Sequence, residues 1–375
     1  MEWKEVRLGD ILNFRRGHDL PHSAMKPGNI PVAGSNGVIG YHDTATPIKP
    51  ILTIGRSGNV GKPYFYEEAW AHNTTLYVDD FKGNDPKFLY YLCQTMPFAN
   101  FGGGSAVPTL NRNHIHPLET KIPVKVEDQR RIASILSSFD RKIELNNKIN
   151  ADLEEMAQAI FKNWFVDFEP FKDGKFVDSE LGMIPEGWKV GTLGDITKNK
   201  SAKVKERNDV KVLSPVTTGE LVLSEEYFTK QVFSSSIAKY KIVNKGDFAY
   251  NPARVNIGSL GRNEFDFDGC VSPVYVVFSV LDGYENYFDL FRKTDFFKDS
   301  VASLAIGGVR QSLSYDDLSS IEVIITSENA VEEFNNLYNQ MKKTIKANKL
   351  ENSRLSLLRD TLLPRLMSGE LEVPE

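Results

Sequence analysis

One long segment of this chain occurs twice. The run Ile132–Phe165 matches Phe334–Met367 after a shift of 202 positions (334 minus 132). The matched positions include apolar residues and asparagines: Ile143 with Ile345, Asn146 with Asn348, Asn150 with Asn352, and Leu153 with Leu355. The regions before them also begin alike, with Trp3-Lys4 and Leu8-Gly9-Asp10-Ile11 in one and Trp188-Lys189 and Leu193-Gly194-Asp195-Ile196 in the other. This repetition predicts two copies of one unit, each a globular part followed by a long helix.

Both long segments have the pattern of a helix with one apolar face. Their seam positions follow in steps of four and three, as the a and d positions of a heptad repeat do. The seams are Ile132, Leu136, Phe139, Ile143, Asn146, Asn150, Leu153, Ala157, Ile160 and Trp164, and Phe334, Tyr338, Met341, Ile345, Asn348, Asn352, Leu355, Arg359, Leu362 and Leu366. The pattern predicts that the two helices form an antiparallel coiled coil with a pseudo-two-fold axis.

Two asparagines interrupt each apolar seam at the same place. A polar residue on such a seam lowers stability but fixes the register of the helices. Antiparallel pairing places Asn146 opposite Asn352 and Asn150 opposite Asn348, so that the side-chain amides can satisfy each other. The alternative is that these four residues lie at the solvated edge of the helices.

The remaining regions alternate short β-rich runs with turns that contain Gly, Pro and Asn, which predicts two mixed but mostly β globular domains. Strands are expected at 51–54, 74–78, 121–124, 210–213, 248–250, 274–280 and 321–325, and a helix at 86–94. The fold class is therefore α+β. The expected boundaries are 1–126 for the first globular domain, 127–168 for the first long helix, 169–187 for a linker, 188–327 for the second globular domain and 328–375 for the second long helix.

Composition excludes several classes of protein. The 375 residues carry a net charge of −5 and 41% hydrophobic residues, which is ordinary for a soluble globular protein. No apolar run approaches the roughly 20 residues that span a bilayer, and the start of the chain has no secretory pattern. Cys93 and Cys270 are far apart, which fits free thiols in a reducing cytoplasm. The net charge argues against indiscriminate binding of nucleic acid, unless cations are focused locally.

Several stretches resemble the specificity (S) subunit of type I restriction-modification systems. They are Leu181-Gly182-Met183-Ile184-Pro185-Glu186-Gly187-Trp188-Lys189, the two Leu-Gly-Asp-Ile starts, Leu358-Arg359-Asp360-Thr361-Leu362-Leu363-Pro364-Arg365-Leu366, and the turns Arg56-Ser57-Gly58-Asn59-Val60-Gly61 and Arg254-Val255-Asn256-Ile257-Gly258. The resemblance covers the whole chain, including the order globule, helix, globule, helix.

The resemblance implies a DNA-reading protein without catalysis of its own. In that family each globular part is a target-recognition domain that reads one half of a split DNA site. The paired helices hold the two domains apart and dock two methyltransferase (M) subunits, which bring S-adenosylmethionine and methylate adenine. This chain is then expected to bind double-stranded DNA and two M subunits and to need no cofactor. Because its globular parts differ in sequence, the two half-sites should differ as well. Whether two restriction (R) subunits join the complex stays open.

A reader of DNA needs Arg, Lys, Asn and Gln at loop tips, where they can pair with base edges or phosphates. The candidates in the first globular part are Arg15, Arg16, Arg56, Asn59, Lys62, Ser105, Thr109, Asn111 and Arg112. Those in the second are Lys198, Lys200, Lys203, Arg254, Asn256, Arg262, Arg310, Gln311 and Ser312. The alternative is that these loops and charge runs are merely solvated.

Other residues have a partner or metal interpretation. Apolar helix residues outside the seams are expected to be exposed and are hypothesised to contact M: Ile135, Met156, Phe161, Leu337, Leu358 and Leu363. All six histidines, at positions 18, 22, 42, 72, 114 and 116, lie in the first globular part. His18 and His22 could share a helical face, and His114 and His116 one face of a strand. No Cys or carboxylate completes a zinc pattern, so no metal site is expected.

Two other functions remain open from the sequence. Asn84-Asp85-Pro86-Lys87-Phe88 and Asn251-Pro252-Ala253-Arg254 faintly resemble the motif of adenine methyltransferases. Neither has the second proline followed by the aromatic residue that stacks on a flipped base. The other possibility is a scaffold whose globular parts bind protein and not DNA.

Overall fold

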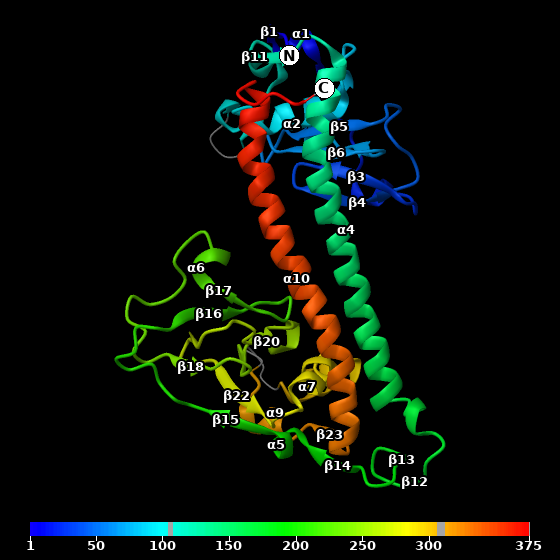
Figure 1. The fold of residues 1–375 in the computed structure, drawn as a ribbon, viewed down its shortest axis with the longest axis vertical. Coiled ribbons are helices and arrows are strands. Elements are labelled where there is room, and N and C mark those ends of the chain that lie inside the picture. Colours follow the sequence, from blue (N-terminus) through cyan, green and yellow to red (C-terminus); the bar gives the residue numbers. More distant parts are fainter. Residues whose placement is uncertain (104–107, 306–311, 375) are drawn as a thin grey trace. The chain divides into compact units, whose positions relative to one another are not determined.

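The computed structural model describes residues 1–103, 108–305 and 312–374. The chain divides into two compact units. Unit 1 comprises Met1–Lys148 with Ala347–Glu375, and unit 2 comprises Ile149–Lys346. The boundary between the units crosses each long helix near its middle, so each unit holds one globular part and one half of each helix (Figure 1). No helix among the described residues is both long enough and apolar enough to cross a membrane.

The two long helices are α4 (Val126–Phe165) and α10 (Glu328–Met367), each of 40 residues. Both begin within one residue of the predicted position. The first ends before the expected 168, and the residues after Met367 lie outside the second helix. Glu127 and Asp128 in the first turn of α4 suit the positive end of a helix dipole.

Short strands make up most of both globular parts. Unit 1 contains β1 (Trp3–Arg7), α1 (Leu8–Ile11), β2 (Asn13–Arg16), η1 (His22–Ala24), β3 (Ile30–Gly34), β4 (Gly37–His42), β5 (Ile51–Gly55), β6 (Pro63–Tyr66), β7 (Trp70–Ala71), β8 (Thr75–Asp80), α2 (Pro86–Thr95), η2 (Phe98–Phe101), β9 (Gly102–Gly103), β10 (Thr109–Leu110), α3 (Arg112–Ile115) and β11 (Glu119–Pro123). Unit 2 contains η3 (Glu169–Phe171), β12 (Phe176–Val177), β13 (Ile184–Pro185), β14 (Lys189–Thr192), α5 (Leu193–Ile196), β15 (Thr197–Lys200), β16 (Lys211–Pro215), β17 (Leu221–Leu223), α6 (Ser224–Tyr227), β18 (Lys241–Val243), β19 (Phe248–Tyr250), η4 (Val255–Ile257), β20 (Leu260–Arg262), β21 (Gly269–Val271), β22 (Val276–Val280), α7 (Glu285–Phe291), α8 (Asp295–Leu304), α9 (Tyr315–Ser319) and β23 (Glu322–Ile325).

The strands of the two units follow the same order. The four-stranded antiparallel sheet β2-β8-β5-β6 of unit 1 corresponds to β15-β22-β19-β20 of unit 2. The pair β1-β11 corresponds to β14-β23, and the sheet β4-β3-β7 corresponds to β17-β16-β21, each with one antiparallel and one parallel pairing. Strand β18 adds to the last sheet in unit 2 only. The predicted duplication and the α+β fold class are therefore confirmed.

The repeated Leu-Gly-Asp-Ile motif has a local structural role. It forms the one-turn helices α1 and α5, each directly before the first strand of the four-stranded sheet. The carboxylate of Asp10 accepts from the backbone N–H of Arg7 at 3.3 Å, and that of Asp195 accepts from the N–H of Thr192 at 2.8 Å. This hydrogen bond from the backbone to the Asp carboxylate stabilises the turn that leads into β2 and β15.

Within unit 1 the two helices pair in antiparallel fashion. Arg359 Nη1 donates to Asp140 Oδ1 at 2.7 Å, and Asn146 Nδ2 donates to Asn352 Oδ1 at 2.9 Å, so the numbers rise along α4 while they fall along α10. Asn146 is 0% exposed, which contradicts the solvated-edge alternative for this residue. The predicted contact between Asn146 and Asn352 is present, while that between Asn150 and Asn348 stays a prediction.

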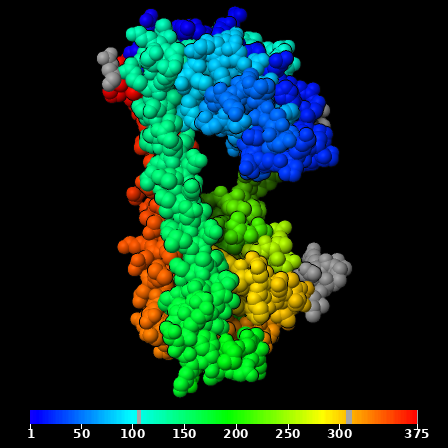
Figure 2. Space-filling model, turned by 90° about the vertical axis from the view of Figure 1, so that its right-hand side faces the viewer, coloured from blue at the N-terminus to red at the C-terminus, as the bar shows by residue number. Residues whose placement is uncertain are grey.

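In unit 2 the halves of the helices pair through aromatic and aliphatic residues. The rings of Trp164 and Phe334 lie 6.1 Å apart, and Ala157, Tyr338 and Met341 are buried in the same core. Figure 2 shows the second half of α4 in green beside the first half of α10 in orange. The seam positions of this unit are thus packed as the heptad pattern predicted.

Two apolar residues that were expected at the surface are buried. Phe161 is 1% exposed and packs on Phe165, Tyr287 and Phe334, and Leu363 is 8% exposed in the core of unit 1. The expectation was wrong because each helix packs against its globular part as well as against the other helix. More than one stripe of each helix is therefore buried.

Candidate nucleic-acid interface

Arginines from three separate segments meet at a cleft in unit 1. Its volume is about 420 Å³, and it is lined by Arg15, Arg16, Arg56, Thr109, Asn111 and Arg112, together with Leu76 and Leu110. The six polar residues were all candidates from the sequence. The structure therefore brings together the end of β2, the turn after β5 and the segment from β10 to α3.

Backbone contacts join the turn after β5 to the segment from β10 to α3. The N–H of Leu110 donates to the carbonyl of Arg56 at 2.8 Å, and Ser57 forms an isolated antiparallel β-bridge with Thr109. The side chain of Asn111 accepts from the N–H of Asn113 at 3.0 Å and so caps α3. Because α3 begins at the next residue, this cap places Arg112 at the edge of the cleft.

Two of the four guanidinium groups are held by carbonyl oxygens. Arg112 Nη1 donates to the carbonyl of Phe14 at 3.1 Å, and Arg56 Nη1 donates to that of Asn73 at 3.4 Å. A carbonyl orients a guanidinium without cancelling its charge. These two cations are therefore positioned in the cleft and keep their full charge.

The other two guanidinium groups have weak ion pairs at the surface. Arg15 lies 3.5 Å from Asp79, and Arg16 lies 3.4 Å from Asp19, and both arginines are more than half exposed. Exposed pairs of this kind contribute ~0–1 kcal/mol, so a phosphate can compete for these cations. Four cations against two carboxylates leave the cleft positive, as a DNA-facing surface requires.

A half-buried histidine supports the strand that carries Arg15 and Arg16. His116 Nε2 accepts from the N–H of Phe14 at 3.1 Å, and its ring stacks on that of Phe14. Burial, together with the nearby Arg112 and Lys82, lowers the pKa of His116. The neutral ring therefore accepts a hydrogen bond within the protein.

The expectation that His114 and His116 share a strand was wrong, since His114 lies in α3 and His116 is the C-cap residue of that helix.

Asn59 and Lys62 lie outside the cleft, in the turn between β5 and β6, and both are exposed. The turn is tight: a side chain on Gly55 would meet the carbonyl of Asn59 at 1.8 Å, and Gly61 has a φ of +81°. Lys62 places its ammonium 5.4 Å from the ring centre of Tyr64. Ser105 lies outside the described residues.

The equivalent surface of unit 2 has different chemistry. The N–H of Leu313 donates to the carbonyl of Pro252 at 3.1 Å, as Leu110 does to Arg56 in unit 1. Pro252 therefore occupies the position that Arg56 occupies in unit 1. The match of Arg56 with Arg254 in the sequence was out of register by two residues. Likewise Tyr315 begins α9 where Arg112 begins α3.

The described candidate residues of unit 2 differ in their surroundings. Lys198, Lys203, Arg254, Asn256 and Ser312 are exposed. Lys200 is bound to the buried carboxylate of Asp247 at 2.7 and 2.9 Å. Its ammonium is therefore already engaged inside the protein. Arg310 and Gln311 lie outside the described residues.

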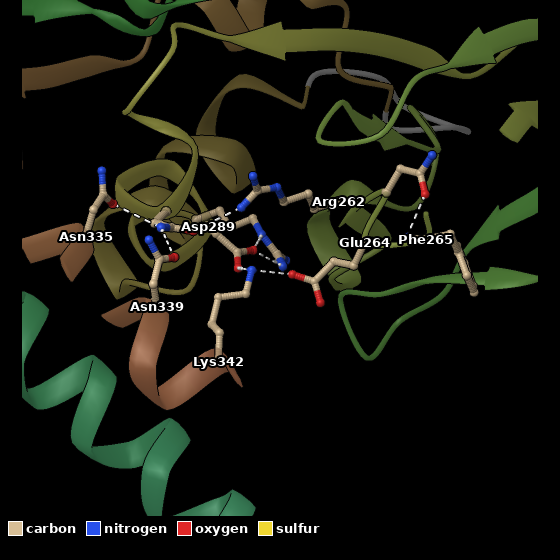
Figure 3. Close-up of polar contacts among 10 residues, drawn as sticks. Arg262, Glu264, Phe265, Asp289, Asn335, Asn339 and Lys342 are labelled. Atoms are coloured by element: carbon tan, nitrogen blue, oxygen red, sulfur yellow. Dashed lines mark hydrogen bonds and ion pairs between the residues drawn. The ribbon is translucent and has the colours of Figure 1, made fainter. Parts of the chain in front are cut away.

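The guanidinium of Arg262 is engaged within unit 2 and belongs to a polar cluster (Figure 3). Its Nη1 donates to Asn286 Oδ1 at 3.0 Å, and its guanidinium lies 5.9 Å from the ring centre of Phe248. Arg262 lies on β20 and contacts Asn286 of α7, whereas Arg254 and Asn256 lie at η4, so their grouping as a DNA-contacting set stays a prediction. No local pattern in the sequence indicated the polar cluster to which Arg262 belongs.

The helix residues considered for partner contact differ in exposure. Met156, Leu337 and Leu358 are exposed, Ile135 is half-buried, and Phe161 and Leu363 are buried. Leu350 and Leu357 of α10 were missed, although Leu357 is 70% exposed. Their off-seam positions could have identified them.

The Asn-Asp-Pro motif that raised a methyltransferase possibility caps a helix. Asp85 accepts from the N–H of Phe88 at 2.8 Å at the start of α2. Asn84 donates to the carbonyl of Ile11 at 3.0 Å and accepts from Gln129 at 2.9 Å. Within residues 1–103, 108–305 and 312–374, no three His, Cys, Asp or Glu side chains are grouped so that they could hold a metal ion.

Comparisons with known proteins agree with the resemblance. The family model for the type I restriction modification DNA specificity domain matches residues 1–155. The specificity subunit of the type I restriction enzyme MjaIX from Methanocaldococcus jannaschii is 30% identical over 305 residues, covering 77% of this chain and 70% of that protein. The HindI specificity subunit from Haemophilus influenzae is 25% identical over 460 residues, covering 98% and 94%. A type I S subunit from M. genitalium has a similar fold, with a TM-score of 0.63, 16% identity and 98% and 96% coverage.

Proposed function

Because the chain belongs to the family of type I restriction enzyme specificity subunits, we propose that it reads a bipartite, asymmetric DNA target and carries methyltransferase subunits to it. In this proposal 1–126 and 188–327 are the two target-recognition domains. The helices 127–168 and 328–375, with the linker 169–187, are the spacer. The protein has no catalysis of its own and works in the cytoplasm, where its DNA lies. Two M subunits join it, with R subunits where cleavage occurs.

The observation that carries the proposal is the cleft with four arginines in unit 1. Base reading needs fixed hydrogen-bond donors, and Arg56 and Arg112 are fixed by carbonyl oxygens. Phosphate contact needs accessible cations, and Arg15 and Arg16 are accessible. We therefore assign the first pair to bases and the second pair to phosphates.

The asymmetry of the target follows from the differences between the two units. Positions that are equivalent in the backbone carry Arg56 and Arg112 in unit 1, but Pro252 and Tyr315 in unit 2. Two surfaces that offer different donors select different bases. The half-sites of the target should accordingly differ.

The assignment of Arg15 to phosphate is tested by Arg15→Ala in the complex with its M subunits. The variant should weaken binding to all duplexes alike and reduce the salt dependence of affinity by about one phosphate contact. Arg130→Ala is the matched control: both side chains are nearly two-thirds exposed (63% and 64%), and both have weak ion pairs. Equal effects of the two substitutions on affinity and salt dependence would contradict the proposal.

Arg56→Ala should instead reduce discrimination between base sequences at one half-site.

Docking of M is tested at an exposed apolar position of α10. Leu358→Asp should reduce co-purification with M by about tenfold or more, because a carboxylate would have to be buried in the contact. Ser353→Asp adds the same charge at another exposed position of that helix. If both variants retain M equally, the surface that contains Leu358 does not dock M.

The other two functions have less support. A methyltransferase would need its Asn-Pro motif at a base-binding site, but Asn84 and Asp85 are engaged in capping α2. A scaffold that binds only protein does not account for four arginines in one cleft. Binding of labelled S-adenosylmethionine by the isolated chain would favour the methyltransferase.

A further inference from the structure

A cluster of polar side chains joins the globular part of unit 2 to α10 (Figure 3). We name it the polar joint. Its members are Arg262 and Glu264 at the end of β20, Asn286, Asp289 and Arg292 in and after α7, and Asn335, Asn339 and Lys342 in α10. All of them belong to unit 2.

Asn286 is the centre of the amide contacts. It is 7% exposed, and its Nδ2 donates to Asn335 Oδ1 at 3.0 Å and to Asn339 Oδ1 at 2.9 Å. Its Oδ1 accepts from Arg262 Nη1 at 3.0 Å. Both amide protons and the carbonyl oxygen of Asn286 are therefore used, and a shift of α10 along or around its axis would break at least one of these bonds.

A buried carboxylate forms the second half of the joint. Asp289 is bound to Arg292 at 2.6 Å and lies 4.0 Å from the ammonium of Lys342, which also pairs with Glu264. Burial alone would raise the pKa of Asp289, but Arg292 and Lys342 hold it well below its usual range. The carboxylate therefore stays ionised and binds a cation of α10.

The joint occupies one stripe of α10. Asn335, Asn339 and Lys342 follow in steps of four and three, so they lie on one face of the helix. The next stripe, Phe334, Tyr338 and Met341, is apolar and packs in the core of unit 2. Apolar contacts tolerate sliding and rotation, whereas hydrogen bonds do not. The polar stripe thus adds direction to a contact that the apolar stripe stabilises.

Unit 1 has other chemistry on the matching stripe of α4. A shift of 202 positions lays Asn335, Asn339 and Lys342 on Ala133, Ser137 and Asp140. Ala133 and Ser137 are buried. Asp140 accepts from Tyr91 of α2 and from Arg359 of α10. The amide network therefore belongs to the second copy alone.

We propose that the polar joint is a positioning element, which fixes the direction of the second target-recognition domain on α10 and so restricts the gap between half-sites that the protein accepts. This inference rests on the proposed function. One base pair of added gap turns the half-sites by about 35° relative to each other, so a small change of domain direction alters which gap fits.

The test replaces directional contacts by apolar ones of similar size. Asn286→Leu with Asn339→Leu removes the donors and the acceptor of Asn286 together with the acceptor of Asn339, and so takes a partner from Arg262 and Asn335 as well. Asn339→Leu alone is the milder variant, because Asn339 is exposed and its replacement removes its own hydrogen bond with Asn286 while the bonds from Asn286 to Arg262 and Asn335 remain. Asn336→Leu, at an exposed position three residues before Asn339 on α10, is the matched control.

The first measurement is made on the full chain without DNA. Spin labels on introduced cysteines at Asn199 and Lys343, both exposed in unit 2, report the distance from β15 to α10. Burial raises the pKa of Cys93 and Cys270, so these native thiols react slowly. The distance distribution should broaden about twofold in the double variant and less in Asn339→Leu, and should stay unchanged in Asn336→Leu. An unchanged width in both joint variants overturns the inference, whatever the protein binds.

The second measurement uses the complex with M and duplexes whose gap is the native length or one base pair longer or shorter. The double variant should lose about tenfold of its preference for the native gap. A broadened distance with unchanged gap preference overturns the positioning role. A wild-type complex that has no gap preference contradicts the proposed function itself, which separates the two failures.

Discussion

At the level of single residues, the cleft of unit 1 depends on side chains that act behind it. Arg15 and Arg16 end a strand that is held by a hydrogen bond from Phe14 to His116. The same Phe14 accepts from Arg112 through its carbonyl. Position 14 therefore links the arginines that we propose to contact phosphates with Arg112, which we propose to contact a base, and His116 holds the backbone of that position.

Acid should weaken this link. The pKa of His116 is lowered in the folded protein, so below its ordinary value of 6.5 the unfolded chain binds more protons than the folded one. The contribution of the neutral ring is therefore complete above about pH 6.5 and is lost as the pH falls from there toward the folded pKa. Thermal unfolding of the wild type and of His116→Gln between pH 7.5 and about pH 5 checks this.

The difference in stability between these two proteins should shrink as the pH falls. His114→Gln provides the comparison, because His114 is exposed. If the difference between wild type and His116→Gln does not change with pH, His116 does not carry this effect.

The sequence predicted which residues line the cleft of unit 1, but it did not predict the orientation of Arg262 in unit 2. Arg56 and Arg112 follow a strand end and a capped turn, and such local patterns place a side chain at a loop tip. Arg262 is the last residue of a strand, but the direction of its side chain depends on the pairing of β20 with β19 and on α7. Long-range packing of this kind has no local signature, so the contact between Arg262 and Asn286 could not be predicted.

At the level of elements, each long helix packs against the other helix with one stripe of residues and against a globular part with another. The heptad seams were predictable because their period of seven is local in the sequence. The burial of Phe161 and Leu363 was not, because a heptad describes the contact of two helices and not of a helix with a globular part. The central strands β5, β8, β19 and β22 of the corresponding four-stranded sheets lie near their predicted positions, but the outer strands β2, β6, β15 and β20 were not predicted. Very short strands such as β7 and β13 carry too few residues for a periodic signal.

The asparagine pair in unit 1 should couple energetically. Asn146→Leu or Asn352→Leu alone leaves a polar partner in the seam without its contact and should cost about 1–3 kcal/mol. The double substitution should cost less than the sum, because two leucines pack against each other. Thermal or denaturant unfolding of the four proteins gives the coupling energy.

Asn163→Leu, at an exposed position of α4, supplies the control. Combined with Asn352→Leu, it should give an additive effect on the free energy of unfolding. Additive behaviour of the Asn146 and Asn352 substitutions would mean that their contact contributes nothing to the register.

At the level of the whole molecule, one architecture is used twice with different surfaces. Each unit combines the same order of strands with one half of each long helix. The residues that face the proposed target differ, with Arg56 and Arg112 in one unit and Pro252 and Tyr315 in the other. Duplication followed by divergence of loop residues explains how one chain can carry two readers of different sequence.

The most direct test is a map of methylated adenines in host DNA, made with and without this chain while its M subunits are present. The proposed function predicts methylation at a single split sequence, with two unlike half-sites and a gap of fixed length, which disappears when the chain is removed. A continuous target, two identical half-sites, or methylation that persists without the chain would contradict it.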